Sequence, residues 1–217
     1  MTDSKIEHRV RQLRENARYD EASVHAILDA GLVAHVGFVD DGQPYVIPML
    51  YARDGQRLYL HGARKARIVK LLAAQARVCV NVTLLDGVVA ARSAFNSSLN
   101  YRSVVVFGSG RLLERDHEKQ HALRVLSEAV FPGRWDELRD PSAAELGQTG
   151  VIELPIEIAS AKVAEGPPTD DESDYATPVW AGVVPVTTTL GQPEGDGRLL
   201  AGVALSPAIA ALVGRRL

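Results

Sequence analysis

The sequence predicts a mainly β protein, built as a closed or partly closed antiparallel barrel with two or three inserted helices. Two Asp-Gly pairs, Asp41-Gly42 and Asp54-Gly55, lie one strand apart, which is typical of an antiparallel meander. Residues 77–85 alternate strictly between apolar and polar side chains, as a half-buried strand does. Residues 101–113 form a long strand with two interior glycines, and such glycines mark the bends that a barrel requires.

The other elements follow from local signals in chain order. Asp20 is expected to cap a helix that ends near Gly31, and Asp116 a helix that runs to about Val130. Ser206-Pro207 begins a short helix near the carboxyl end. Apolar spacing predicts a further helix at 65–74, and β-branched and aromatic residues predict strands at 32–39, 45–52, 58–61, 88–91 and 151–163.

Composition indicates one globular domain: an arm at residues 1–16, a barrel at 17–163, and a linker with a carboxyl-terminal segment at 164–217 that packs on the barrel or on a partner subunit. The net charge of -3 argues against a nucleic-acid binder held by a basic face. No apolar run suits a signal peptide or a membrane span, so we expect a cytoplasmic protein without a membrane partner. The single cysteine, Cys79, lies in an alternating strand and is interpreted as a packing residue.

The segment from His61 to Arg67 is the strongest candidate for a binding site. A predicted strand ends at His61-Gly62, and the next helix starts a few residues later. A helix start offers free backbone N–H groups, and Arg64, Lys65 and Arg67 add three cations at the same place. This combination suits a phosphate monoester, whereas the alternative is a solvated basic helix face.

Three stretches follow one another in the chain: residues 42–51 (GQPYVIPMLY), residues 58–62 (LYLHG) with the basic cluster after them, and residues 100–108 (NYRSVVVFG). In this order they resemble the pyridoxamine 5'-phosphate oxidase-like split barrels that bind flavin mononucleotide (FMN), above all the subfamily with the nitroimidazole-resistance proteins. The resemblance covers roughly residues 17–163. It implies a split β-barrel with peripheral helices.

The resemblance also implies a role for each matching residue. Arg64, Lys65 and Arg67 would hold the FMN phosphate, and His61 would lie beside the ribityl chain or the ring. Pro48, Met49 and Leu50 would line the isoalloxazine ring, largely through backbone groups. Arg102 and Ser103 would reach the flavin from the neighbouring subunit, and Trp180 would help to cover it. We therefore expect a homodimer with flavin at the subunit interface.

The expected activity is that of a flavin-dependent oxidoreductase acting on a small organic substrate, with NADH or NADPH as candidate electron donors. No catalytic residue is assigned. Two alternatives stay open: a non-catalytic flavin-binding or flavin-shuttling module, and a barrel that uses deazaflavin or haem in place of FMN. Ala63 and Ala66 stand where many relatives have serines, so more of the phosphate binding falls to Arg64 and Lys65. The carboxyl end also lacks the Arg-Leu-x-Pro pattern of true pyridoxamine phosphate oxidases, which disfavours vitamin B6 oxidation.

One motif points elsewhere. Residues 117–121 read HEKQH and match the H-E-x-x-H pattern of zinc peptidases. A zinc site needs a third ligand and a dry cleft, and neither Glu137 nor Glu145 is marked as that ligand. We interpret the segment as an exposed amphipathic helix and expect no metal site.

Overall fold

The structure, a computed structural model, describes residues 7–217. Within this range ten strands form one antiparallel sheet in the order β1-β9-β6-β5-β2-β3-β4-β8-β7, and β10 pairs with β5. The strands are β1 (Ala17–Arg18), β2 (Val33–Asp40), β3 (Gln43–Asp54), β4 (Arg57–Ala63), β5 (Arg77–Ala90), β6 (Ser98–Ser109), β7 (Arg111–Leu112), β8 (Thr149–Pro155), β9 (Ile158–Ala164) and β10 (Gly182–Pro185). The helices are α1 (Glu21–Ala30), α2 (Arg67–Ala73), α3 (Asp116–Val130), α4 (Ala143–Gln148) and α5 (Pro207–Ala210). The expected mainly β split barrel with peripheral helices is confirmed.

Two strands close the barrel by changing partners along their length. Strand β3 pairs with β2 through residues 43–50 and with β4 through residues 51–54. Strand β6 runs through Gly110 into β7, which pairs with β8. A Cβ atom at Gly110 would lie 2.5 Å from Ile152 Cγ2, so only glycine lets the chain cross at this point. The main core fills the barrel with apolar side chains from both halves, among them Val36, Leu60, Val80 and Leu154.

The Asp-Gly turns fall where the sequence predicts them. Asp41 and Gly42 both have positive φ, at 49° and 77°, as a two-residue hairpin loop of this kind requires. Asp54 ends β3, and Gly55, with φ 55°, begins the loop to β4.

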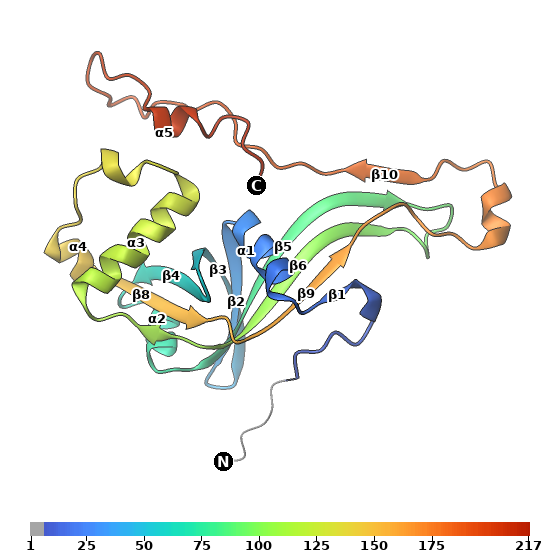
Figure 1. The fold of residues 1–217 in the computed structure, drawn as a ribbon, viewed down its shortest axis with the longest axis horizontal. Coiled ribbons are helices and arrows are strands. Elements are labelled where there is room, and N and C mark those ends of the chain that lie inside the picture. The colour runs from blue at the N-terminus through green and yellow to red at the C-terminus, as the bar shows by residue number, and fades with distance from the viewer. Residues whose placement is uncertain (1–6) are drawn as a thin grey trace.

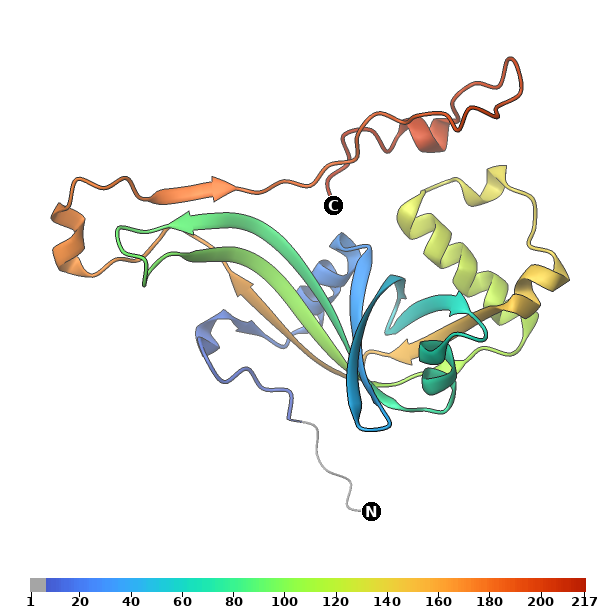
Figure 2. The ribbon, with the colours of Figure 1, turned by 180° about the vertical axis from the view of Figure 1, so that it is seen from behind.

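A curved arm extends from the barrel (Figures 1 and 2). The arm consists of the long ends of β5 and β6, with β9 beside β6 and β10 on the other edge of β5. From β10 the chain runs back in an extended course toward α5 and α3, as the orange and red ribbon shows. The carboxyl-terminal segment thus connects the arm to the helices on the far side of the barrel.

Two predicted strands are in fact one, because pairing with β6 continues past an irregularity. Residues 77–85 and 88–90 both belong to β5, which ends one residue before the predicted end at 91, and the register shifts between Leu85 and Gly87. Residues 101–113 and 151–163 were each predicted as one strand, but each is two. Gly110 separates β6 from β7, and residues 156–157 separate β8 from β9. In both cases the chain changes its pairing partner, a tertiary event that has no local periodicity.

The helices cover the barrel and fill its ends. Helix α1 packs Val24, Ile27 and Leu28 into the main core, and its predicted cap is confirmed because the Asp20 side chain accepts a hydrogen bond from Ser23 N. Helix α3 builds a second core with the outer face of β4 and β8. Its expected cap is wrong by one residue: Arg115 is the N-cap position, and Asp116 is the first helical residue.

The short helix at the carboxyl end is confirmed, with Ser206 as its cap and Pro207 in its first turn. Of the predicted amino-terminal arm, residues 1–6 lie outside the described range, and residues 7–16 contain only a 3-10 turn at Arg14–Asn16. No helix within the described range is long and apolar enough to cross a membrane.

Candidate functional site

The candidate site lies where β3 and β4 separate. Their pairing ends at the pair Tyr51–Leu60. Beyond it, residues 43–50 pair only with β2, and His61 to Ala63 pair only with β8. Each strand therefore presents one backbone edge without a partner strand. We call the place where these two edges diverge the β3/β4 split.

Backbone N–H groups are directed into the β3/β4 split. Tyr51 N donates to Leu32 O at 3.4 Å, on the β2 side of the strand. Because successive N–H groups of a strand point in opposite directions, the N–H of Leu50 points to the split. Pro48 has no N–H to offer. Its side chain is exposed, whereas the Met49 side chain is buried in the main core. The backbone N–H of Met49 points to the β2 side, as that of Tyr51 does.

His61 lies at the mouth of the β3/β4 split and carries an unsatisfied polar atom. Strand alternation sends Leu58 and Leu60 into the main core and puts His61 on the same side as Tyr59, which belongs to the second core. The Nδ1 atom of His61 is buried and has no hydrogen-bond partner. Burial also lowers the pKa of His61, so the ring is neutral near pH 7. An orphaned buried atom of this kind indicates a missing ligand or water.

The three predicted cations are close together in sequence but engage different partners. Arg64 forms an ion pair with Glu114, at 2.9 Å from Nη2 to Oε2. Arg67 lies 3.6 Å from Asp40 and 4.7 Å above the ring of Tyr45. Lys65 is exposed, and no ion pair or hydrogen bond to it occurs among the described residues. Lys65 is therefore the cation most available to an incoming phosphate.

Helix α2 starts two residues later than predicted, at Arg67 instead of Lys65. Ala66 is extended, with φ -62° and ψ 142°, and no side chain caps the helix. Arg64 and Lys65 consequently lie in the turn between β4 and α2. This turn is held in place because Arg64 N donates to Gln148 O at 2.8 Å, and because Gly150 packs directly against Val69 of α2.

The remaining predicted residues lie on the arm, away from the β3/β4 split of the same chain (Figure 1). Arg102 and Ser103 are in the middle of β6, and Arg102 forms a two-pronged ion pair with Asp86 at 2.7 and 2.9 Å. Trp180 precedes β10, is 68% exposed and packs its ring on Gly182. Within one chain the predicted site residues therefore form two separate groups, one at the β3/β4 split and one on the arm.

Sequence reasoning missed the counter-charges of the cluster. Glu114 follows β7, fifty positions after Arg64, and Asp40 ends β2. Neither carries a local signal, since only the closure of the barrel brings them to Arg64 and Arg67. Tyr45, which stacks on Phe38 with ring centroids 5.4 Å apart, was likewise assigned to a strand but not to the cluster.

The HEKQH segment forms the first turns of α3. Glu118 accepts hydrogen bonds from Arg111 and Arg115, and His121 is hydrogen-bonded to Asp54 at 2.9 Å. The segment is not exposed throughout, because Lys119 is buried and donates to Leu146 O. In residues 7–217 no group of three or more His, Cys, Asp or Glu side chains is placed to hold a metal ion.

Two solved structures are similar to the chain over nearly its full length. The flavocytochrome Anf3 from Azotobacter vinelandii is 43% identical, with a TM-score of 0.89, and the match covers 94% of this chain and 96% of that one. The FAD and haem binding protein from Mycobacterium smegmatis is 37% identical, with a TM-score of 0.88, covering 92% of this chain and 98% of that one.

A third structure shows the fold alone. A candidate 5-nitroimidazole antibiotic resistance protein from Bacteroides thetaiotaomicron is 22% identical, with a TM-score of 0.59 over 68% of this chain and 86% of that one. No protein with a curated description matches the chain. The model of the pyridoxamine 5'-phosphate oxidase family matches residues 20–163, about two thirds of the sequence. The barrel, its split and this match agree with the resemblance seen in the sequence, and the chain belongs to the pyridoxamine 5'-phosphate oxidase family.

Proposed function

We propose that the chain binds a flavin nucleotide in the β3/β4 split and acts as a flavin-dependent redox protein. The observation that carries this proposal is the buried, unpartnered Nδ1 of His61 at the mouth of the split. The two full-length relatives support it, because one is a flavocytochrome and the other binds FAD and haem. When bound, the flavin supplies hydride and single-electron transfer, and the protein supplies position and electrostatics.

The residues around the split fit the parts of a flavin. The N–H of Leu50 would donate to the polar edge of the ring, with exposed Pro48 against its apolar face. His61 would satisfy its Nδ1 on the ring edge or on a ribityl hydroxyl, and its neutral ring can donate or accept there. Lys65 would bind phosphate, with Arg64 shared between the phosphate and Glu114.

A second copy of the chain would complete the site. Arg102, Ser103 and Trp180 lie on the arm, too far along the fold to join the β3/β4 split of their own chain. In a twofold dimer, the arm of one chain would reach the split of the other, so that each flavin contacts both subunits. The exposed tryptophan at the arm supports this arrangement, because large exposed aromatic residues mark interfaces.

The nucleotide is proposed to be FAD, with FMN as the alternative. The Mycobacterium smegmatis relative binds FAD, and its 37% identity extends over 92% of this chain. Haem binding is a second proposed function, carried by the same relative and by the flavocytochrome. Turnover of a small organic substrate, with NADH or NADPH as donor, is proposed from the family.

Identification of the small molecules that copurify with the chain tests these proposals. We expect a yellow protein that releases FAD or FMN on heating, and haem identified by its pyridine haemochromogen. Bleaching of the flavin by NADH or NADPH without oxygen would support the reductase over a storage module. A chain that takes up neither FAD nor FMN after reconstitution would refute the flavin proposal.

A further inference from the structure

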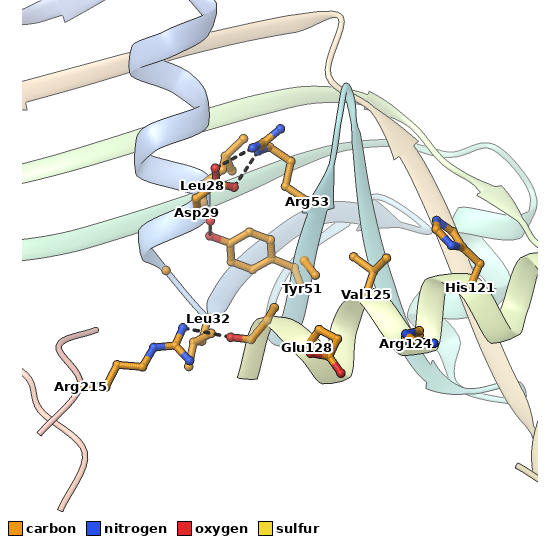
Figure 3. A pocket seen from close by; sticks show the side chains of 13 residues that line it. Leu28, Asp29, Leu32, Tyr51, Arg53, His121, Arg124, Val125, Glu128 and Arg215 are labelled. Atoms are coloured by element: carbon orange, nitrogen blue, oxygen red, sulfur yellow. Dashed lines mark hydrogen bonds and ion pairs between the residues drawn. The ribbon is translucent and has the colours of Figure 1, made fainter. Parts of the chain in front are cut away.

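A separate cavity of about 570 Å³ lies between α1, β3 and α3, on the side of the barrel to which the carboxyl-terminal segment returns (Figure 3). Its size is within the range of pockets that hold organic cofactors, roughly 300–1,000 Å³. The apolar part of its wall consists of Leu28, Leu32, Ala52, Val125 and Ala129. We call it the α1/α3 cavity.

We propose that the α1/α3 cavity is the haem site of this protein and that His121 is an iron ligand. This inference rests on the proposed haem binding and adds its place and its ligand. Haem iron in proteins is held by His, Cys, Met or Tyr side chains. Among the residues that line the cavity, only His121 and Tyr51 belong to this set.

Tyr51 is not available as a ligand. Its hydroxyl is buried and donates to the carbonyl oxygen of Leu28 at 2.5 Å. Burial raises the pKa of Tyr51, so the phenolate that iron requires does not form near neutral pH. The Tyr51 side chain instead forms part of the floor of the cavity, between Leu28 and Val125 in Figure 3.

His121 has the surroundings of a metal-binding histidine. Its side chain is 57% exposed, and its Nε2 is hydrogen-bonded to Asp54 Oδ2 at 2.9 Å. Histidines that bind metals usually donate one ring N–H to a carboxylate, which fixes the tautomer and leaves the other nitrogen as the donor atom. With Asp54 as acceptor, the Nδ1 lone pair of His121 is left for a metal.

The charges around the α1/α3 cavity suit the two propionates of haem. Three arginines line it, Arg53, Arg124 and Arg215, against two carboxylates, Asp29 and Glu128. Both carboxylates are occupied: Asp29 accepts from Arg53 at 2.6 and 2.7 Å, and Glu128 accepts from the N–H of Gly133 at 2.7 Å. The cavity therefore has no unpaired carboxylate among its lining residues. Its arginines also have partners: Arg53 is paired with Asp29, Arg124 with the exposed Asp136 at 3.0 Å, and Arg215 with backbone carbonyls. A propionate would therefore replace Asp136 on Arg124 or share Arg215 with these carbonyls.

Another cavity with histidines fits haem less well. It contains His8 and His25, has a volume of about 340 Å³, and its charged lining residues other than the histidines are Glu21 and Glu157. Two carboxylates without an arginine would repel propionates. The neighbouring cavity that shares His8 and Tyr19 with it is lined by Arg9, Arg11 and Arg14, but Val10 is its only aliphatic lining residue. The apolar wall of the α1/α3 cavity is therefore the better match to the haem ring.

The carboxyl-terminal segment provides independent support. The family model ends at residue 163, whereas the two relatives named for haem match 94% and 92% of this chain. Arg215, within the segment that the model leaves out, donates to the carbonyls of Ala129 and Val130 at 3.0 and 3.2 Å and lines the cavity. Because the first match leaves out only 6% of this chain, it includes most of the segment after residue 163, and this segment supplies Arg215 to the cavity.

The α1/α3 cavity also adjoins the β3/β4 split. Tyr59 shares a face of β4 with His61, and its ring meets that of His121 edge to face at 6.0 Å. Tyr59 thus lies between the proposed iron ligand and the proposed flavin contact. A haem on His121 and a flavin beside His61 would be neighbours on one face of the barrel.

The test compares His121→Ala with His117→Ala in full-length protein supplied with hemin and FAD. His117 lies one turn earlier on α3 and is exposed, so it is a matched control. We expect His121→Ala to lose at least about nine tenths of the bound haem, by Soret absorbance and pyridine haemochromogen, while flavin content and the circular dichroism spectrum stay as in the wild type. His121→Gly with added imidazole should regain the Soret band. Asp54→Asn should weaken haem binding about 10- to 100-fold.

The possible results distinguish the assignment of His121 as iron ligand from the proposal that the protein binds haem. Unchanged haem in His121→Ala would overturn the ligand assignment but leave haem binding intact. Loss of haem in His117→Ala to the same degree would also overturn it. A wild-type chain that binds flavin but takes up no hemin would refute both the haem function and this site, with the flavin proposal unaffected.

Discussion

The buried imidazole of His61 makes the stability of the fold depend on pH. Burial lowers the pKa of His61 below its ordinary value of 6.5. Below that value the unfolded chain binds a proton at this residue more readily than the folded chain does, so stability is lost as the pH falls and regained as it rises. We predict a lower urea midpoint for the wild type at about pH 5.5 than at about pH 7.5, and a smaller difference for His61→Gln. An undiminished difference in His61→Gln would contradict this account; His117→Gln serves as the control.

The ion pair between Arg64 and Glu114 competes with a bound phosphate. Both side chains are partly exposed, at 38% and 63%, and such pairs contribute less than about 1 kcal/mol. We predict that Glu114→Gln releases Arg64 and tightens flavin binding roughly two- to fivefold, measured by quenching of flavin fluorescence. Weaker binding in Glu114→Gln would mean that the glutamate positions Arg64 for the phosphate instead of competing for it.

Individual residues differed in how well the sequence predicted them. His61 and Lys65 were found because a strand end, a glycine and a cluster of cations are adjacent in the chain. Glu114 and Asp40 were not found, since they reach the cluster only through barrel closure. The orphaned Nδ1 of His61 is a property of packing and has no sequence signal at all.

At the scale of elements, the contact between α2 and β8 positions the turn at which we propose that phosphate binds. A Cβ atom at Gly150 would lie 2.4 Å from Val69 Cγ1 and 3.3 Å from Arg64 Cα. We predict that Gly150→Ala displaces α2, costs about 1–3 kcal/mol of stability, and weakens flavin binding as well. Gly147→Ala is the matched control, because nothing lies within 4 Å of its Cβ position and alanine favours helix α4. Equal stability of the two variants, by urea unfolding, would show that the close contact does not hold α2 in place.

The elements that sequence predicted best have local signals. The Asp20 and Ser206 caps and the two Asp-Gly turns depend on residues within four positions of one another. The predicted break at 85–88 does not occur, because β5 continues to pair with β6. Breaks at 110 and 156–157 were not predicted, because they arise where the chain changes its partner strand. The α1/α3 cavity could not be predicted from the sequence either, because its walls come from three elements that are far apart in the chain.

At the scale of the whole molecule, the proposed homodimer gives the arm a role in the flavin site of the partner subunit. If the arm completes the β3/β4 split of a partner, two different defects can complement each other. In a heterodimer of Lys65→Ala and Ser103→Arg chains, one site contains both defects and the other contains neither. We predict that purified heterodimers bind about one flavin per two chains, whereas each parent homodimer binds little. Absence of flavin in the heterodimers would place the whole site within one chain; Gln120→Arg, on the exposed side of α3, controls for the added charge.

We propose that a flavin nucleotide is bound by its phosphate at the turn between β4 and α2. The most direct test of this proposal is titration of the Arg64→Ala, Lys65→Ala double variant and the wild type with FAD, FMN and riboflavin, followed by flavin fluorescence. We predict that the wild type binds FAD or FMN at least about tenfold more tightly than riboflavin, and that the double variant loses this preference while remaining folded. A wild type that binds all three equally, or a double variant that keeps the preference, would contradict the claim.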